Sequence, residues 1–448
     1  MNTPVFFHGA IIHSLEPNKL EILPNAALLI NTEGRIEAFS KDYTSSPLAI
    51  PPAAEILEMP PGNFLIPGFI DTHNHAAQWS MRGLGQGLHI LDWLSQVTFP
   101  YEARFSDAKY ARRIYESCVE GFLQQGITTA SYYCSKHAEA SQILAEICVQ
   151  KGQRAFVGKC NMDRSAPDFI RDESAATSLA ETRECVEHIR GLGSALVKPV
   201  LTPRFAICCS PDLLEGLGAM MKDDEQLAMQ THFNEAEQEI RATRELFPQF
   251  QNEADLYESF GLLGNRSILA HCTIMSEYEM ERLKSLECGI AHCPISNMTV
   301  GGGFMAAPIR EFLRRGIKVG LGTDSGGGFA SGMLDNMRQA MIASNAREVM
   351  SAGKDNALSM EEVFYLATLG GAKVMCLEEE IGNFEVGKQF DACWINMRSS
   401  SIATMYEEGD EVGKSFEKFV MTGDDRNIMS VYVRGKRVAG YEKQDKRE

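Results

Sequence analysis

From about residue 67 onward, short apolar segments alternate with longer segments of helical apolar spacing. Residues 108–124 show the helical pattern, with Ser106 as the expected N-cap and Gly126 as the stop signal. The first apolar segment, residues 64–70, is short and bounded by Pro and Gly, which predicts a buried strand. The rhythm of the chain is therefore that of alternating strands and helices.

Eight segments have the length, apolar content and turn boundaries of buried strands. They are residues 64–70, 127–132, 155–159, 195–201, 227–231, 267–270, 289–291 and 318–321. Helical patterns lie between them, for example at 178–190, 276–286 and 309–315. Eight such units over about 300 residues predict an α/β protein with a TIM-like (β/α)8 barrel, with a doubly wound open sheet as the alternative.

Both ends of the chain carry short strands instead of this alternation. The N-terminal strands are expected at residues 5–7, 10–12, 26–30 and 36–39, and the C-terminal ones at 392–395, 429–433 and around Val438. Gly34 closes a hairpin turn, and Ser359 begins a helix with a capping box. We predict a small β-sandwich domain formed by residues 1–66 and 380–448, beside a barrel domain at 67–379.

Composition narrows the classes of function. The chain has 448 residues, 44% of them apolar, and a net charge of −17. No apolar run approaches the ~18 residues of a membrane span, and the strong negative charge argues against binding nucleic acid or an anionic membrane. Twelve cysteines occur without a Cys-x-x-Cys motif, and the N-terminus lacks a signal-peptide pattern. We therefore expect reduced thiols in a cytoplasmic protein, and a small neutral partner remains compatible with the charge.

Five predicted metal ligands follow predicted strands. His73 and His75 end the first strand and share a face, because side chains two apart in a strand point the same way. His232, His271 and Asp324 follow the fifth, sixth and eighth strands. A barrel gathers these strand ends at one mouth. Each residue alone has an ordinary explanation, but together they predict one divalent ion, zinc with iron as the alternative, and room for a water.

Two further residues are placed to assist that water. Glu235 lies three residues after His232, and a metal-bound water has its pKa lowered from 15.7 toward about 7. Glu235 would take its proton and pass it to the substrate, unless it is a surface residue of the acidic helix that follows. His292 ends the seventh strand and is expected to orient Asp324 or the water, with a core histidine as the alternative. Lys198 lies inside the fourth strand, which favours one metal over two.

These residues resemble the amidohydrolase superfamily over nearly the whole chain. The resemblance rests on residues 67–75, His232, His271, 291–294 and 322–324. More narrowly, the chain is similar to the guanine deaminases of the mononuclear zinc branch. The segments that carry this similarity are 73–78, 92–94 with 98–100, 202–205, 232–235 and 320–327.

The resemblance implies a hydrolase acting on the C–N bonds of cyclic amidines, in which water attacks C2 of guanine and gives xanthine and ammonia. It implies one zinc per subunit held by His73, His75, His232, His271 and Asp324, with catalytic roles for Glu235, His292 and Asp324. The residues expected to contact the purine base are His75, Gln78, Trp93, Arg204, Phe205, His232, Glu235 and Asp324. Homologous enzymes suggest a homodimer.

The chemistry of the base site agrees with these residue types. Arg204 only donates hydrogen bonds, which suits the carbonyl oxygen of guanine, and Gln78 can donate and accept. Phe205 and Trp93 can cover the ring. The alternatives are a structural ion pair for Arg204 and core packing for the two aromatic residues. At the level of function, the alternatives are another aminated heterocycle (8-oxoguanine, a pterin, a triazine or an adenine derivative) and a barrel that has lost catalysis.

Overall fold

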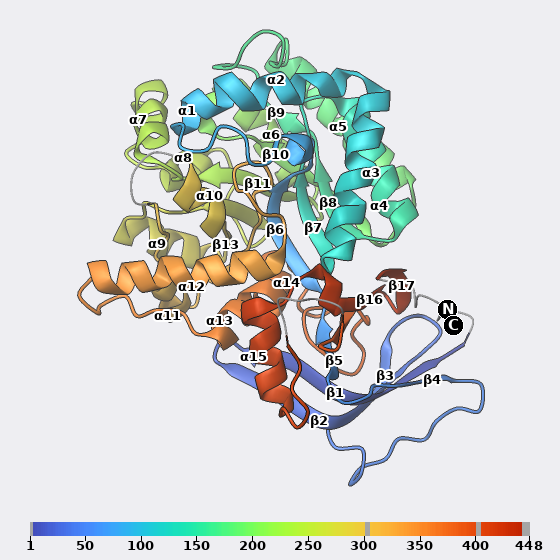
Figure 1. Ribbon diagram of the computed structural model, residues 1–448. Coiled ribbons are helices and arrows are strands. Elements are labelled where there is room, and N and C mark those ends of the chain that lie inside the picture. Colours follow the sequence, from blue (N-terminus) through green and yellow to red (C-terminus); the bar gives the residue numbers. More distant parts are fainter. Residues whose placement is uncertain (1–2, 301–304, 400–404, 441–448) are drawn as a thin grey trace.

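Eight parallel strands form a nearly closed barrel in the computed structural model, which describes residues 3–300, 305–399 and 405–440 (Figure 1). Neighbouring strands pair in the order β6, β7, β8, β10, β11, β12, β13, β14. Their bounds are β6 (Phe69–His75), β7 (Ile127–Tyr133), β8 (Arg154–Gly158), β10 (Val197–Pro203), β11 (Ala228–Phe233), β12 (Ser267–His271), β13 (Gly289–His292) and β14 (Lys318–Leu321), and β9 (Cys160–Asn161) pairs with β10. The predicted TIM-like barrel is confirmed.

The two outer strands of this sheet, β6 and β14, are joined just beyond β14. The carboxylate of Asp71 in β6 accepts hydrogen bonds from the backbone N–H (2.9 Å) and hydroxyl (2.7 Å) of Thr323. The backbone N–H of Asp324 donates to the carbonyl of His73 at 2.9 Å. These bonds bring the carboxyl ends of the first and last barrel strands together, which places His73 beside Asp324.

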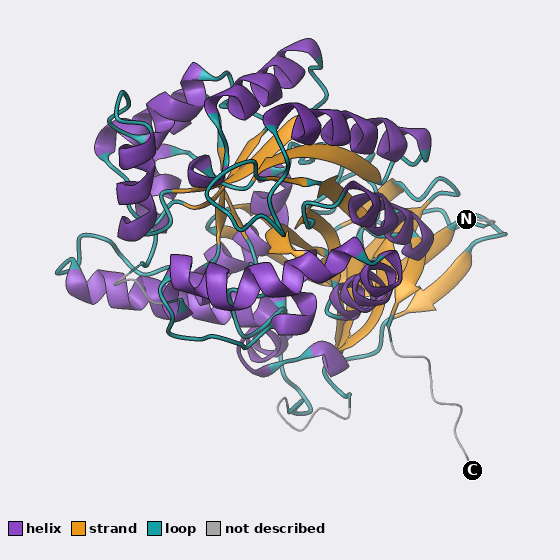
Figure 2. Cartoon of the chain, turned by 90° about the horizontal axis from the view of Figure 1, so that it is seen from above, coloured by secondary structure: helices purple, strands orange, loops and turns teal. Residues whose placement is uncertain are grey.

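Helices surround the barrel strands (Figure 2). The helices between β6 and β14 are α1 (Ile90–Trp93), α2 (Phe99–Glu102), α3 (Ala108–Gln124), α4 (Ala138–Lys151), α5 (Ala175–Gly191), α6 (Pro211–Asp223), α7 (Glu237–Leu246), α8 (Glu253–Ser259), α9 (Glu277–Ser285), α10 (Pro294–Thr299) and α11 (Ile309–Arg315). After β14 come α12 (Met333–Met350), α13 (Met360–Tyr365), α14 (Gly371–Val374) and α15 (Val412–Thr422). No helix in the described ranges combines the length and the apolar character that crossing a bilayer would require.

The helix predicted at residues 108–124 has those limits in the structure, but its N-cap is Asp107 and not Ser106. The Asp107 side chain accepts hydrogen bonds from the backbone N–H groups of Lys109 and Tyr110, which are otherwise without helical partners. The capping box at Ser359 is present as predicted and begins α13.

Strands from both chain ends form a second sheet, separate from the barrel, in the order β17, β16, β15, β5, β1, β2, β3, with β4 paired to β1 (Figure 1). Their bounds are β1 (Val5–Glu16), β2 (Lys19–Ile30), β3 (Ile36–Ser40), β4 (Glu55–Glu58), β5 (Asn63–Pro67), β15 (Ala392–Asn396), β16 (Ile428–Val433) and β17 (Lys436–Ala439). The limits proposed for the two domains stay a prediction, and residues 1–2, 400–404 and 441–448 of the predicted ends lie outside the described residues.

The strand predicted at residues 64–70 is two strands that belong to different sheets. β5 pairs with β1 and β15 in the sheet of the chain ends, whereas β6 pairs with β7 in the barrel. Gly68 separates them, and a Cβ atom there would lie 2.2 Å from Thr128 Oγ1. The close approach of the barrel to this point therefore requires glycine, and the chain passes from one sheet to the other here.

The segments predicted as separate strands at 5–7 and 10–12 belong to one strand, β1. A register shift in its pairing with β2 falls between Gly9 and Ile11, so a bulge interrupts the sequence pattern without ending the strand. The hairpin turn at residues 31–34 is confirmed, with Gly34 at φ +80° and its N–H bonded to the carbonyl of Asn31.

Candidate active site

The predicted metal ligands converge at the carboxyl ends of the barrel strands. His73 Nε2 lies 3.1 Å from Asp324 Oδ1, and His75 Nε2 lies 3.4 Å from the same oxygen. His75 Nε2 is also 3.0 Å from His232 Nε2. Each of these four buried residues offers a ligand atom, and the four atoms lie within 4.8 Å of one another. The cluster can hold a metal ion.

His271, the fifth predicted ligand, lies beside this cluster. Its Nε2 atom is 3.7 Å from Glu235 Oε2 and is buried without a hydrogen-bond partner among the described residues. It also forms a group with His73 and Cys293, within 4.8 Å. Burial raises the pKa of the Cys293 thiol well above its ordinary value, so this cysteine is a poorer ligand than the imidazoles.

The outer nitrogens of two of these histidines are hydrogen-bonded in a way that points the inner nitrogens at the cluster. His232 Nδ1 lies 2.6 Å from the carbonyl oxygen of Arg204, and His271 Nδ1 lies 2.8 Å from Asn297 Oδ1. A neutral imidazole has one N–H, which these oxygens draw to Nδ1, so both Nε2 atoms present lone pairs. Such outer hydrogen bonds accompany metal-ligating histidines. Burial lowers the pKa of both rings, which favours the neutral, ligating form.

The carboxylate of Asp324 is held in its ionised form. Burial alone would raise its pKa, but the hydrogen bond with His73 and the surrounding imidazoles lower it well below the ordinary value. Asp324 and His271 also have left-handed backbone, at φ +43° and +76°, as do the neighbouring Asn234 (+45°) and Cys272 (+47°). Such conformations cost about 1–3 kcal/mol each in residues other than glycine and cluster at functional sites.

Glu235 faces the ligand cluster as a buried carboxyl group. Burial raises its pKa well above the ordinary value, and the charge of Asp324 raises it further. It therefore binds a proton more readily than an exposed glutamate and is placed within reach of the metal-ligand atoms. These are the properties of a group that takes and returns a proton at neutral pH.

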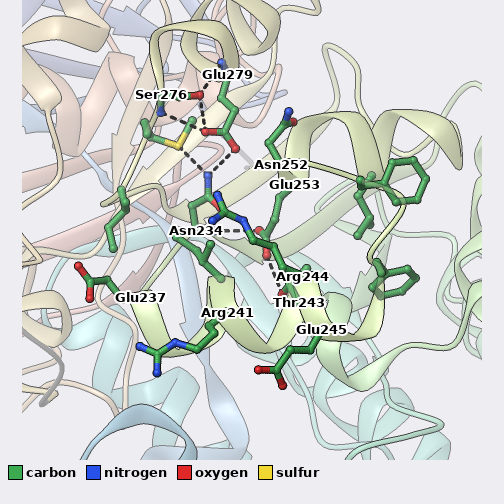
Figure 3. A pocket seen from close by; sticks show the side chains of 16 residues that line it. Asn234, Glu237, Arg241, Thr243, Arg244, Glu245, Asn252, Glu253, Ser276 and Glu279 are labelled. Carbon is green, nitrogen blue, oxygen red and sulfur yellow. Dashed lines mark hydrogen bonds between the residues drawn. The ribbon is translucent and has the colours of Figure 1, made fainter.

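Three helices, α7, α8 and α9, hydrogen-bond to the turn that carries Glu235, and Figure 3 shows the bonds from Asn234 to α8 and α9. The backbone N–H of Asn234 donates to Glu253 Oε2 (2.9 Å) on α8, and its side-chain amide donates to Glu279 Oε1 (2.8 Å) on α9. The backbone N–H of Glu235 donates to Glu239 Oε2 (2.6 Å) on α7. A cavity of about 720 Å³ opens on this side of the turn and includes Asn234, Glu253 and Glu279 in its lining.

A second cavity opens directly onto the ligand cluster. All eight residues predicted to contact the base line it. The lining residues are His75, Gln78, Ile90, Trp93, Leu94, Arg204, Phe205, His232, Glu235, Val300, Asp324 and Gly327. Ile90, Trp93, Leu94, Phe205 and Val300 supply the apolar part of the lining. The polar lining residues lie near the strand ends. A mostly apolar lining with a few polar groups is usual for a small-molecule site.

Two polar residues of this cavity, Gln78 and Arg204, are held by a buried residue outside the lining that the sequence did not reveal. Glu102, at the end of α2, forms a two-point ion pair with Arg204, with Nη1–Oε2 2.7 Å and Nη2–Oε1 3.1 Å. Gln78 Nε2 donates to the same carboxylate at 2.9 Å. The ion pair considered for Arg204 is thus present, and the same guanidinium lines the cavity. Glu102 lies just after the segment 98–100, and that proximity was the available signal.

The remaining predicted residues are less directly engaged. His292 ends β13 and is buried, and burial lowers its pKa to about 3. No hydrogen bond joins His292 to Asp324 in the described part of the chain, and its Nδ1 has no partner there, so its orienting role stays a prediction.

The Trp93 indole donates to the carbonyl of Leu84 at 3.2 Å while its ring lines the cavity. Lys198 is exposed within β10, away from the strand end.

Tyr133, which the sequence analysis did not select, ends β7 beside the ligands. Its ring centroid is 4.8 Å from that of His73 and 4.7 Å from that of His75, and its hydroxyl is buried without a hydrogen-bond partner in the described chain. The signal for it was its place at the end of the second barrel strand, but a tyrosine there is as easily explained by core packing.

A barrel with imidazole and carboxylate ligands at its strand ends is the arrangement of a metal-dependent hydrolase, and the chain belongs to the amidohydrolase family, whose model matches residues 64–438. It is 39% identical over 445 residues to a guanine deaminase from Dictyostelium discoideum, covering 96% of this chain and 97% of the relative. It is 37% identical to the guanine deaminase of Homo sapiens, covering 97% and 96%. Among solved structures, it resembles a guanine deaminase from C. acetobutylicum with bound guanine in the active site, with a TM-score of 0.88, 32% identity, and coverage of 97% and 99%.

Proposed function

We propose that this protein catalyses the hydrolytic deamination of guanine to xanthine and ammonia. The observation that carries the proposal is a single cavity that joins the polar pair Gln78 and Arg204 to Glu235 and the ligand cluster. The similarity to guanine deaminases along nearly the whole chain supports the same substrate.

The five predicted ligands fit one zinc ion. Their donor set is nitrogen and carboxylate oxygen, and the Nε2 atom of His271 is buried without another partner in the described chain. His73, His75, His232, His271 and Asp324 would hold the ion. When bound, a zinc ion at this place supplies Lewis-acid activation of the attacking water.

The side chains account for the remaining steps. Water adds to C2 of guanine, the bond from C2 to the amino nitrogen breaks, and ammonia leaves. Glu235 takes a proton from the water and returns it to the departing amine, which its raised pKa and its position in the cavity wall allow. Arg204 donates to the carbonyl oxygen of the base, and Phe205 and Trp93 lie along the ring.

Three further features belong to the same proposal. His292 would influence Asp324 or the water without touching the substrate, since it is absent from the lining of the cavity. A cytoplasmic location is part of the proposal and is supported by the free cysteines, of which eleven are buried and one, Cys376, is exposed. A homodimer is expected by analogy with homologous enzymes.

The test is to measure guanine turnover and zinc content on one preparation of the full-length protein. We expect xanthine and ammonia in equal amounts and about one zinc per chain. A protein that contains zinc but leaves guanine unchanged would contradict the proposal. Ranking guanine against 8-oxoguanine, a pterin, a triazine and an adenine derivative by kcat/KM should place guanine first. An adenine derivative lacks the carbonyl oxygen that Arg204 would meet, and the similarity to guanine deaminases supports guanine over the other heterocycles.

A further inference from the structure

The carboxylate of Glu102 does not line the base cavity itself but hydrogen-bonds to two residues that do, Gln78 and Arg204. Its side chain is fully buried, and its two oxygens accept from both terminal nitrogens of Arg204 and from Gln78 Nε2. Gln78 and Arg204 are themselves almost completely buried. A carboxylate accepts but cannot donate, so every partner must turn an N–H group toward it.

This constraint decides which way the Gln78 amide points. If the amide were rotated by half a turn, its oxygen would face the Glu102 carboxylate at hydrogen-bond distance, and two acceptors would repel each other. The NH2 group therefore faces Glu102, and the amide oxygen is not used in this network, while the Gln78 side chain lines the cavity. That oxygen is buried without a hydrogen-bond partner among the described residues. An unmade hydrogen bond on a buried acceptor is costly, so a ligand that donates to it gains affinity.

Arg204 is fixed by the same carboxylate. Its two-point contact holds the plane of the guanidinium, and although burial lowers its pKa, the Glu102 charge raises it above the ordinary value. Nη1 also lies 3.7 Å from Met162 Sδ and 4.0 Å from Cys160 Sγ, both weak acceptors, so Nε and the second N–H of Nη2 are the donors left for a ligand. The Arg204 side chain lines the cavity. The cavity thus combines one amide acceptor with a cationic donor.

We propose that Glu102 is a positioning residue that sets the hydrogen-bond polarity of the base site, and that the site consequently selects heterocycles with a lactam edge, an N–H beside a C=O. Guanine and pterin have such an edge. Adenine and 2,6-diaminopurine have an amino group in place of this carbonyl. The amino group would face Arg204, which cannot accept a hydrogen bond. The inference deepens the proposed function and, for its guanine readouts, rests on it.

The test compares the zinc-loaded full-length enzyme with its Glu102→Asp and Glu102→Gln variants. Aspartate keeps the charge beside Arg204 but cannot reach both partners, and glutamine keeps the size but adds a donor. We expect KM for guanine to rise about tenfold or more, kcat to change less than about threefold, and the guanine to 2,6-diaminopurine ratio of kcat/KM to fall about tenfold. Glu120→Gln, in an exposed pair with Lys151, is the matched control and should change none of these.

The possible results distinguish the role of Glu102 from the proposed deamination of guanine. If the wild type deaminates guanine and the folded variants keep its KM and its substrate ratio, the role of Glu102 is refuted while the proposed function stands. If the wild type does not deaminate guanine, competitive binding decides: tighter binding of guanine and pterin than of 2,6-diaminopurine, lost in the Glu102 variants, supports Glu102 alone. If neither variant folds, the wild-type binding panel decides, and a preference for lactam purines below about threefold overturns the inference.

Discussion

Glu235 shows how burial and neighbouring charge give a single side chain its chemistry. It lies in the wall of the base cavity, 3.7 Å from His271, and both burial and Asp324 raise the pKa of its carboxyl group. The same glutamate at an exposed position would be ionised at neutral pH and would return a proton poorly. The ability of Glu235 to return a proton therefore depends on the buried position that the fold gives it.

Replacement of this group tests its role. Glu235→Gln keeps the size of the side chain but removes its ability to accept a proton, so we expect kcat for guanine to fall by a factor on the order of 10²–10⁴. Zinc content and the circular dichroism spectrum should stay as in the wild type. Glu237→Gln, two residues on and exposed, is the control. Near-normal turnover in the Glu235 variant would remove this residue from the mechanism.

At this scale the sequence revealed the residues of the proposed ligand cluster but not the residues that orient them. His73, His75 and His232 could be selected because each follows an apolar strand. Glu102 and Asn297 could not, because each acts through a partner far along the chain, Arg204 in the first case and His271 in the second. The nearness of Glu102 to the segment 98–100 pointed to the site, but nothing local in the sequence identified Arg204 as its partner.

The barrel is closed by contacts between β6 and the chain just after β14, above all by the hydrogen bonds between Asp71 and Thr323. Asp71 accepts from Thr323, from the backbone N–H of His73 (3.2 Å) and from the Asn74 amide (3.2 Å). The same carboxylate therefore fixes the chain beside two proposed ligands, His73 and Asp324. The sequence predicted β6 and β14 as strands, but the division of the segment 64–70 between two sheets depended on Thr128, which approaches Gly68 only in the folded protein.

Asp71→Asn should weaken both stability and metal binding. The amide presents N–H groups to partners that also donate, which leaves buried donors unpaired, and each costs about 1–3 kcal/mol. We expect the free energy of unfolding in urea to fall by about 2–4 kcal/mol and the zinc affinity to fall as well. Asp168→Asn, at an exposed site paired with Arg171, should leave both unchanged. Unaltered unfolding in the Asp71 variant would show that closure does not depend on it.

The turn between β11 and α7 offers a second test at this scale. Glu253→Ala removes the acceptor of the Asn234 backbone N–H, and Asn234 has left-handed backbone, so the turn should relax. We expect kcat to fall at least tenfold with a loss of about 1–3 kcal/mol in stability. Glu253→Gln retains an oxygen acceptor and should recover most of the activity. Equal activity in the alanine and glutamine variants would contradict a positioning role for this hydrogen bond.

For the whole molecule, the proposed metal site links ligand binding to stability. Its ligands come from four strand ends of the barrel, β6, β11, β12 and the segment after β14, so unfolding separates them. An ion that binds only the folded state stabilises it, by about 4 kcal/mol at a thousandfold excess over Kd. We expect removal of zinc with a chelator to lower Tm by several degrees and re-addition of zinc to restore it. A Tm that is indifferent to chelation would argue against the site.

The buried carboxyl groups behind the active site predict how stability depends on pH. The pKa of Glu239 is raised to about 8, mainly by burial and next by the charge of the nearby Glu235. In the unfolded chain the same group titrates near its ordinary value, so between these two pKa values the folded protein holds a proton that the unfolded chain has released. The free energy of unfolding should therefore decrease as pH rises through this window, by about 1.4 kcal/mol per pH unit for one such proton, and level off above pH 8.

Glu239→Gln isolates this contribution. Glutamine cannot ionise, and its oxygen can still accept from the backbone N–H of Glu235. The difference in unfolding free energy between the variant and the wild type should grow in favour of the variant from about pH 6 to pH 8, as expected from the linkage of protonation to folding. Urea unfolding of the metal-free proteins measures it without interference from zinc. Glu245→Gln, exposed on the same helix, should run parallel to the wild type. Parallel curves for Glu239→Gln would mean that Glu239 is already ionised in the folded protein at pH 6.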